Sequence, residues 1–135
     1  SEISPQSLIE YLDTKNKTIC LPMVVNKKQP LIFKPWRPGK KMVIGHYGIS
    51  VPDNDQTLIP DLIICPLLAY DSKGMRLGYG GGFYDRTIKY FRKNKQVKYI
   101  GLAFSGQKSY HDLPSEVHDV PLDAVLTETG MDFFL

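Results

Sequence analysis

The chain has 135 residues, of which 42% are hydrophobic and 23% charged, and its formal net charge is +3. This composition is typical of one globular domain and excludes a disordered chain, collagen and a coiled coil. The sequence contains neither an apolar stretch of the ~18–20 residues that span a bilayer nor a starting signal segment, so we expect a single cytoplasmic domain over residues 1–135.

Helical and extended patterns alternate along the chain. Ser4 and Pro5 are typical of a helix start, and apolar residues follow at helical spacing. A second helical pattern runs from Phe83 to about Lys93. Five apolar runs are predicted as strands: 18–25, 31–36, 61–71, 98–104 and 123–128. Such alternation favours an α/β fold, a three-layer αβα domain with a mostly parallel, covered sheet.

The charges are unevenly distributed. Residues 27–41 and 86–98 each hold six bases and no acid, whereas all charged residues from Asp112 onward are acids. Basic segments of this kind suit an anionic ligand, although they are also compatible with two solvated faces. Aromatic residues in both segments leave nucleic-acid binding as an alternative, but it does not explain the acidic tail or the glycine-rich loop described next.

The most informative segment is a run of glycines that precedes the second predicted helix. Gly78, Gly80, Gly81 and Gly82 let backbone N–H groups approach a ligand, and a helix N-terminus adds further donors. With Arg76 close by, this arrangement predicts a phosphate cradle at the carboxyl end of the 61–70 strand. The alternative is a structural glycine turn, and neither the P-loop nor the dinucleotide-binding fingerprint matches.

Two acids and two cysteines complete the set of candidate groups. Asp85 falls in the first turn of the predicted helix, where it suits the helix dipole or a Mg²⁺ ion beside a phosphate. Asp119 lies in a predicted turn. Cys20 and Cys65 lie in apolar runs, and we expect buried free thiols. Since no nucleophile constellation is present, phosphoryl transfer, which depends on positioning and charge neutralisation, fits best.

This segment resembles the 5-formyltetrahydrofolate cyclo-ligase family, also called methenyltetrahydrofolate synthetase. The family pattern, Gly-x-Arg-Leu-Gly-x-Gly-Gly-Gly followed by two aromatics, Asp and Arg, is matched from Gly74 to Arg86. The resemblance covers essentially the whole chain. Further matching segments are Glu2-Ile3-Ser4, Leu21-Pro22, Trp36, Gly48-Ile49-Ser50-Val51-Pro52 and Asp119-Val120-Pro121-Leu122-Asp123 with Thr127. Val51 departs from the pattern, which often has Glu there.

The resemblance implies that ATP, with Mg²⁺, drives the conversion of 5-formyltetrahydrofolate to 5,10-methenyltetrahydrofolate, giving ADP and phosphate. Arg76 is the implied catalytic residue, and Asp85 and Asp119 are the implied Mg²⁺ ligands. The implied ATP-binding residues are Arg76, Gly78, Tyr79, Gly80, Gly81, Gly82, Phe83, Tyr84 and Asp85. The implied folate-binding residues are Glu2, Trp36, Tyr79, Gly80, Gly81, Gly82 and Phe83.

The resemblance starts at the family's short acidic segment. In the family, this segment follows a helix that carries Lys and Arg residues and then a strand. We therefore expect a cyclo-ligase-like domain that is N-terminally incomplete relative to the family. Losing charged contacts to ATP weakens binding by ~1.5–3 kcal/mol for each hydrogen bond, so the alternative function is a catalytically weak relative that binds folate or a nucleotide. We expect a monomer with small-molecule partners, no nucleic acid and no membrane.

Overall fold

A computed structural model describes residues 3–134, and these form two compact units. The N-terminal unit is Ser4–Pro60, and the C-terminal unit starts at Asp61. The single domain expected from the sequence stays a prediction. No helix among the described residues is long and apolar enough to cross a membrane.

The N-terminal unit starts with a helix and continues as two antiparallel strand pairs. Helix α1 is Gln6–Thr14, and the Ser4 hydroxyl accepts a hydrogen bond from the Gln6 N–H at 3.3 Å. The predicted helix start is therefore confirmed, one residue later than expected, with Pro5 at the capping position. The strands are β1 (Ile19–Met23) paired with β2 (Ile32–Trp36), and β3 (Met42–Ile44) paired with β4 (Ser50–Pro52).

The core of this unit contains Leu31, Phe33 and Val51, which are 4–6% exposed. The predictions for 18–25 and 31–36 are confirmed by β1 and β2. Strands β3 and β4 were not predicted, because three residues each are too few to show a period-two pattern. A short 3₁₀ helix, His46–Gly48, joins them.

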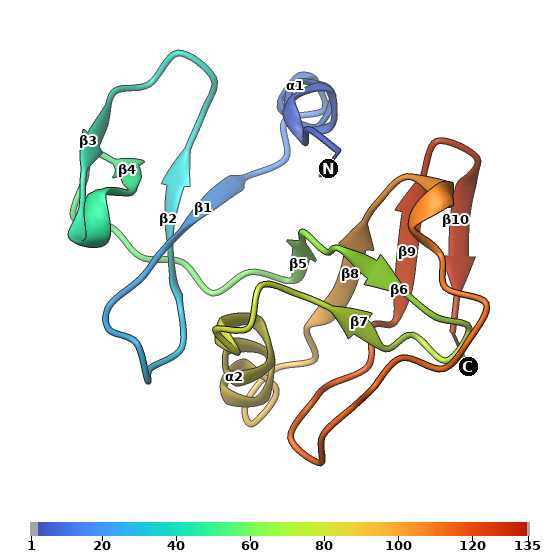
Figure 1. The fold of residues 1–135 in the computed structure, drawn as a ribbon. Helices are drawn as coiled ribbons and strands as arrows, with labels where there is room; N and C mark the ends of the chain where they lie inside the picture. The colour runs from blue at the N-terminus through green and yellow to red at the C-terminus, as the bar shows by residue number, and fades with distance from the viewer. Residues whose placement is uncertain (1–2, 135) are drawn as a thin grey trace. The chain divides into compact units, whose positions relative to one another are not determined.

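The C-terminal unit is built on a four-stranded sheet with the order β10-β9-β8-β5, whose strands lie side by side in Figure 1. The pairs β5–β8 and β8–β9 are parallel, and β9–β10 is antiparallel. The expected mixed α/β class with a mostly parallel sheet is thus confirmed for this unit, whereas the three-layer arrangement stays a prediction. The bounds are β5 (Leu62–Cys65), α2 (Phe83–Phe91), β8 (Lys98–Leu102), β9 (Ala124–Thr127) and β10 (Gly130–Phe133).

The predictions for 83–93, 98–104 and 123–128 are confirmed by α2, β8 and β9. The prediction of one strand over 61–71 is wrong. Strand β5 ends at Cys65, because Pro66 has no N–H to donate to a neighbouring strand. The chain then forms an antiparallel hairpin of β6 (Ala69–Tyr70) and β7 (Arg76–Leu77), so the glycine loop follows β7 instead of a long central strand.

Asp71 organises the turn of this hairpin and is 1% exposed. Its Oδ1 accepts hydrogen bonds from the N–H groups of Lys73 and Met75, and its Oδ2 accepts one from Leu113 at 2.9 Å. Gly74 adopts a φ of +83° in the same turn, a conformation that favours glycine. The turn ends directly before Arg76, the first residue of β7, and so fixes where that strand begins.

The two cysteines are free, as expected. Cys65 is fully buried, and burial raises the pKa of its thiol to about 11. Cys20 is half-buried, and burial raises its pKa as well. The thiolate is the reactive form, so we expect iodoacetamide to modify Cys20 well before Cys65 in the folded protein, as mass spectrometry of tryptic peptides will show. Equal rates in the folded protein would contradict the closed packing around β5.

Candidate functional site

Arg76 is the centre of the candidate site, and its guanidinium is largely buried in the C-terminal unit. Its Nε–H donates to the Tyr99 hydroxyl oxygen at 2.7 Å. Its Nη2 lies 3.9 Å from Oδ2 of Asp85, and the two side chains are only 9% and 15% exposed. The Arg76 guanidinium carbon also lies 5.6 Å from the centroid of the Tyr84 ring, on helix α2. One cation therefore joins β7, β8 and α2.

The charge of Arg76 survives this burial. Burial is the largest influence and lowers the pKa of the guanidinium, but the contacts with Tyr99, Cys65 and Asp85 outweigh it and the pKa is raised overall. An arginine with a raised pKa is protonated at any physiological pH. The site therefore holds a permanent cation in a poorly hydrated place, where it attracts an anion more strongly than an exposed one does.

Gly78 allows Arg76 to lie against the backbone of the loop. A Cβ placed on Gly78 would overlap Nη1 of Arg76. Since the φ of Gly78 is not in the left-handed region, its glycine is required by this close contact and not by backbone strain. The loop and the guanidinium are thus fitted to each other.

We expect Gly78→Ala to destabilise the protein by about 1–3 kcal/mol, the typical cost of forcing extra atoms into a packed place. Arg76 cannot simply swing away, because Tyr99 and Asp85 hold it. Denaturant unfolding measures the change. Gly106→Ala is the matched control, since nothing lies within 4 Å of its Cβ position, and we expect a change within about 0.5 kcal/mol. Equal effects of the two substitutions would contradict the contact.

The glycine loop leads directly into helix α2. Gly80 and Gly82 have φ of +90° and +69°, and Gly82 occupies the capping position of this nine-residue helix. The start of a helix offers backbone N–H donors and a partial positive charge. Tyr79 is 61% exposed. The geometry is that of a backbone turn that can receive an anion next to Arg76.

The two predicted metal ligands come from segments that the structure brings together. Asp85 Oδ1 accepts a hydrogen bond from the Val120 N–H at 3.1 Å, so α2 is joined to the residue that follows Asp119. Asp119 Oδ2 accepts one from the Glu116 N–H at 2.8 Å. His118 Nε2 lies 3.2 Å from Glu116 Oε2 and 4.0 Å from Asp119 Oδ1.

This donor set fits a magnesium ion in its chemistry. Mg²⁺ is typically held by one or two carboxylates, with phosphate oxygens and water completing its coordination. Among residues 3–134 no group of three or more His, Cys, Asp and Glu side chains is arranged to hold a metal ion. A metal at this place would therefore depend on Asp85, Asp119 and the oxygens of a bound phosphate.

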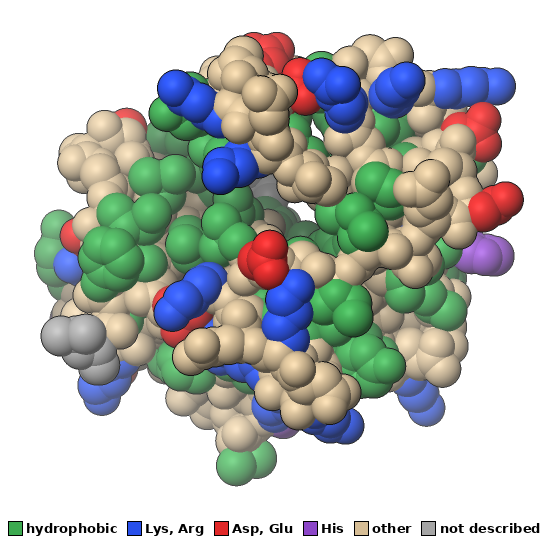
Figure 2. All heavy atoms as spheres, turned by 180° about the vertical axis from the view of Figure 1, so that it is seen from behind, with side chains coloured by type: hydrophobic (Ala, Val, Ile, Leu, Met, Phe, Trp, Pro, Cys, Tyr) green, Lys and Arg blue, Asp and Glu red, His purple; other side chains and the backbone are tan. Residues whose placement is uncertain are grey.

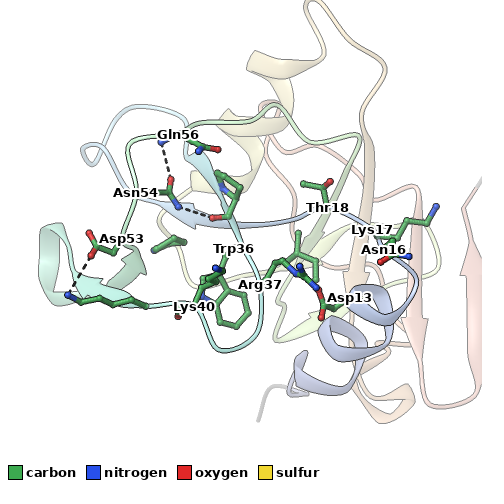
Figure 3. Close-up of a pocket in the computed structure, with 14 residues that line it drawn as sticks. Asp13, Asn16, Lys17, Thr18, Trp36, Arg37, Lys40, Asp53, Asn54 and Gln56 are labelled. Carbon is green, nitrogen blue, oxygen red and sulfur yellow. Dashed lines mark hydrogen bonds and ion pairs between the residues drawn. The ribbon is translucent and has the colours of Figure 1, made fainter.

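Trp36 belongs to the N-terminal unit, where it lines a cavity of about 600 Å³ (Figure 3). Its indole N–H donates to the Lys40 carbonyl oxygen at 3.1 Å. Arg37 and Asp13 form an ion pair of 3.0 Å in the same wall. The structure therefore places Trp36 in a cavity of its own unit, and its folate-binding role stays a prediction. Glu2, another predicted folate-binding residue, lies outside the described residues.

Ion pairs with acids interrupt both basic segments. Lys41 pairs with Asp53 in the N-terminal unit, and Arg92 and Lys95 pair with Asp123 and Asp61 in the C-terminal unit. Large hydrophobic side chains also reach the surface of both units, and Figure 2 shows several of them between Lys and Arg side chains. Some of the positive charge of the basic segments is thus neutralised by neighbouring acids, whereas Arg76 is a cation buried in the candidate site.

The structure also identifies a residue that sequence reasoning missed. Tyr99 is the second residue of β8 and is 0% exposed, and its hydroxyl accepts the hydrogen bond that holds Arg76. In the sequence it looks like one more apolar residue in the run 98–104. The available signal was its hydroxyl, since a buried tyrosine usually finds a hydrogen-bond partner.

Comparisons with known proteins identify a matching family and similar sequences. A model described as the 5-formyltetrahydrofolate cyclo-ligase family matches residues 1–128. The 5-formyltetrahydrofolate cyclo-ligase of Haemophilus influenzae is 40% identical over 131 residues, with 93% of this chain and 69% of the relative covered. The Escherichia coli K12 protein of the same name is 36% identical over 132 residues, with 93% and 71% covered.

Two solved structures of methenyltetrahydrofolate synthetases are also similar to this chain. The NMR structure of Aquifex aeolicus 5,10-methenyltetrahydrofolate synthetase matches with a TM-score of 0.71 and 26% identity, covering 98% of this chain and 66% of that one. A 5,10-methenyltetrahydrofolate synthetase from Mycoplasma pneumoniae matches with a TM-score of 0.66 and 25% identity, covering 92% and 65%. The chain thus spans about two thirds of the length of these solved relatives.

Proposed function

Because the chain belongs to the 5-formyltetrahydrofolate cyclo-ligase family, we propose that it converts 5-formyltetrahydrofolate to 5,10-methenyltetrahydrofolate with ATP and Mg²⁺. The products from ATP are ADP and phosphate. The observation that carries this proposal is the buried guanidinium of Arg76, which lies against the glycine loop beside Asp85. A permanent cation at a backbone cradle is suited to the charge of a phosphoryl group in transfer.

The chemistry needs no nucleophile from the protein. The formyl oxygen of the folate attacks the γ-phosphorus of ATP, and the bond between the γ-phosphoryl group and ADP breaks. The folate N10 then attacks the activated formyl carbon and loses its proton, and the carbon–oxygen bond breaks to release phosphate. Both nucleophiles belong to the substrate, so the protein contributes binding, orientation and charge neutralisation.

The residues of the C-terminal unit take defined roles in this scheme. The backbone N–H groups of residues 78–82 and the start of α2 receive the phosphates, and Arg76 stabilises the charge on the transferred group. The exposed ring of Tyr79 and the neighbouring Phe83 offer aromatic surface to the folate. Trp36 and Glu2 remain our predictions for further folate contacts.

A bound Mg²⁺ would neutralise phosphate charge and hold the phosphate oxygens in place. Asp85 and Asp119 would hold it. The Val120 and Glu116 N–H groups each occupy one oxygen of these two carboxylates, and this orients them while leaving lone pairs for a metal. Asp85 also faces Arg76, so the same carboxylate would position both the cation and the metal.

The test is the formation of methenyltetrahydrofolate by this chain from 5-formyltetrahydrofolate, ATP and Mg²⁺, followed by near-UV absorbance. We expect product only when ATP and Mg²⁺ are both present. ATP binding without turnover would instead support the alternative function of a nucleotide-binding relative. A folded chain that neither turns over nor binds ATP would contradict the proposal.

A further inference from the structure

The phenol of Tyr99 contacts the guanidinium of Arg76 and is buried. Tyr99 is 0% exposed, and its hydroxyl oxygen accepts the Nε–H of Arg76 at 2.7 Å. Its ring centroid lies 5.9 Å from the guanidinium carbon. Since Arg76 follows a hairpin turn and Tyr99 is in the central sheet, this contact joins the loop side of the site to the rigid core.

Tyr99 is itself held firmly. Its backbone N–H donates to Asp123 Oδ2 at 2.8 Å, and its carbonyl accepts the Asp123 N–H at 2.7 Å. The same carboxylate oxygen of Asp123 lies 2.8 Å from Nη2 of Arg92. The phenol therefore has little freedom to move, and a partner bonded to it is fixed as well.

Each nitrogen of the Arg76 guanidinium has a separate contact. Nε is bonded to Tyr99, Nη1 lies against Gly78, and Nη2 is directed at Asp85. A planar guanidinium whose Nε is fixed can no longer turn about its own axis. Nη1 is thereby held against the glycine loop and Nη2 towards Asp85, in the first turn of the helix into which that loop leads.

We propose that Tyr99 is a positioning residue, whose hydroxyl orients Arg76 so that Nη1 and Nη2 present their N–H groups to a phosphate at the glycine loop. This inference rests on the proposed function, because the phosphate is that of ATP. Tyr99 does not touch the substrate and acts through Arg76 alone. Its effect on the affinity for ATP must therefore disappear when Arg76 is replaced.

Tyr99→Phe is the sharpest substitution, since it keeps the ring and removes only the hydroxyl. We expect it to weaken ATP binding about 10-fold in calorimetric titration, and by less than about twofold in an Arg76→Ala background. Tyr110→Phe is the control for the loss of a tyrosine hydroxyl in the same unit, because Tyr110 is 89% exposed and is not a partner of Arg76 in the β6–β7 hairpin. We expect less than about a twofold change there.

A second measurement does not depend on ATP. The ¹⁵N–¹H signal of the Arg76 Nε–H in the full chain should exchange slowly with solvent, and Tyr99→Phe should make that exchange fast while the backbone spectrum stays folded. Unchanged exchange in this variant would overturn the proposal. Equal loss of ATP affinity with and without Arg76 would also overturn it, by showing a merely structural role. A wild-type chain with a protected Nε–H that does not bind ATP would instead refute the proposed function, and with it the phosphate role given to Tyr99.

Discussion

Replacing Arg76 by alanine is expected to lower kcat/KM for ATP by about 100- to 1,000-fold, the size of effect seen when one group that stabilises transition-state charge is removed. We expect a large loss because the Arg76 side chain is 9% exposed and its guanidinium is permanently charged. Water cannot readily take its place at the loop. Steady-state kinetics of methenyltetrahydrofolate formation at several ATP concentrations measures the loss, and ATP titration separates binding from turnover.

Two further variants separate the geometry of the Arg76 side chain from the effect of positive charge alone. Arg76→Lys keeps the charge but cannot interact with Tyr99 and Asp85 at once while lying against Gly78, so we expect most of the loss to persist. Lys73→Ala removes a nearby cation that is 67% exposed and pairs with Asp112 on the surface. Exposed pairs of this kind contribute little, and near-normal kinetics are expected. If Lys73→Ala matched Arg76→Ala, general charge attraction would explain the data and the proposed role of Arg76 would be wrong.

The sequence predicted correctly the elements that a local, continuous pattern determines, and it failed where the structure depends on pairing with distant segments. Helix α2 and strands β8 and β9 were predicted because their patterns are local and continuous. The run 61–71 was misjudged because its apolar pattern continues through Pro66, whereas the strand does not. Apolar periodicity reports which residues are buried, and it does not report which strand a residue pairs with.

The same distinction applies to the candidate site. The stretch from Arg76 to Asp85 is contiguous, so its residue types alone predicted a phosphate site and a cationic side chain beside it. The contacts that organise it come from distant segments: the Tyr99 hydroxyl on β8 and the Val120 N–H near the C-terminus. One belongs to a residue that looks like core, and the other is a backbone group present in every non-proline residue. Neither has a signature in a single sequence.

The second large effect is expected for Asp85→Ala, which should abolish turnover while the chain stays folded. This substitution removes the carboxylate that faces Arg76 and accepts the Val120 N–H. In the proposed mechanism it also removes one of two metal ligands, and we expect a fall in kcat of at least about 100-fold. Turnover as a function of Mg²⁺ concentration measures the effect, and circular dichroism checks the fold.

Asp85→Asn separates the structural contribution of this side chain from its electrostatic one. The amide oxygen can still accept the Val120 N–H, but the negative charge is gone, so the fold should be retained and the Mg²⁺ requirement should rise. Asp112→Asn is the matched control, because Asp112 is an exposed partner of Lys73 and near-normal turnover is expected. A normal rate for Asp85→Asn at ordinary Mg²⁺ would remove Asp85 from the metal role. Its contacts with Arg76 and Val120 would then be its whole function, as a support that joins helix α2 to the segment after Asp119.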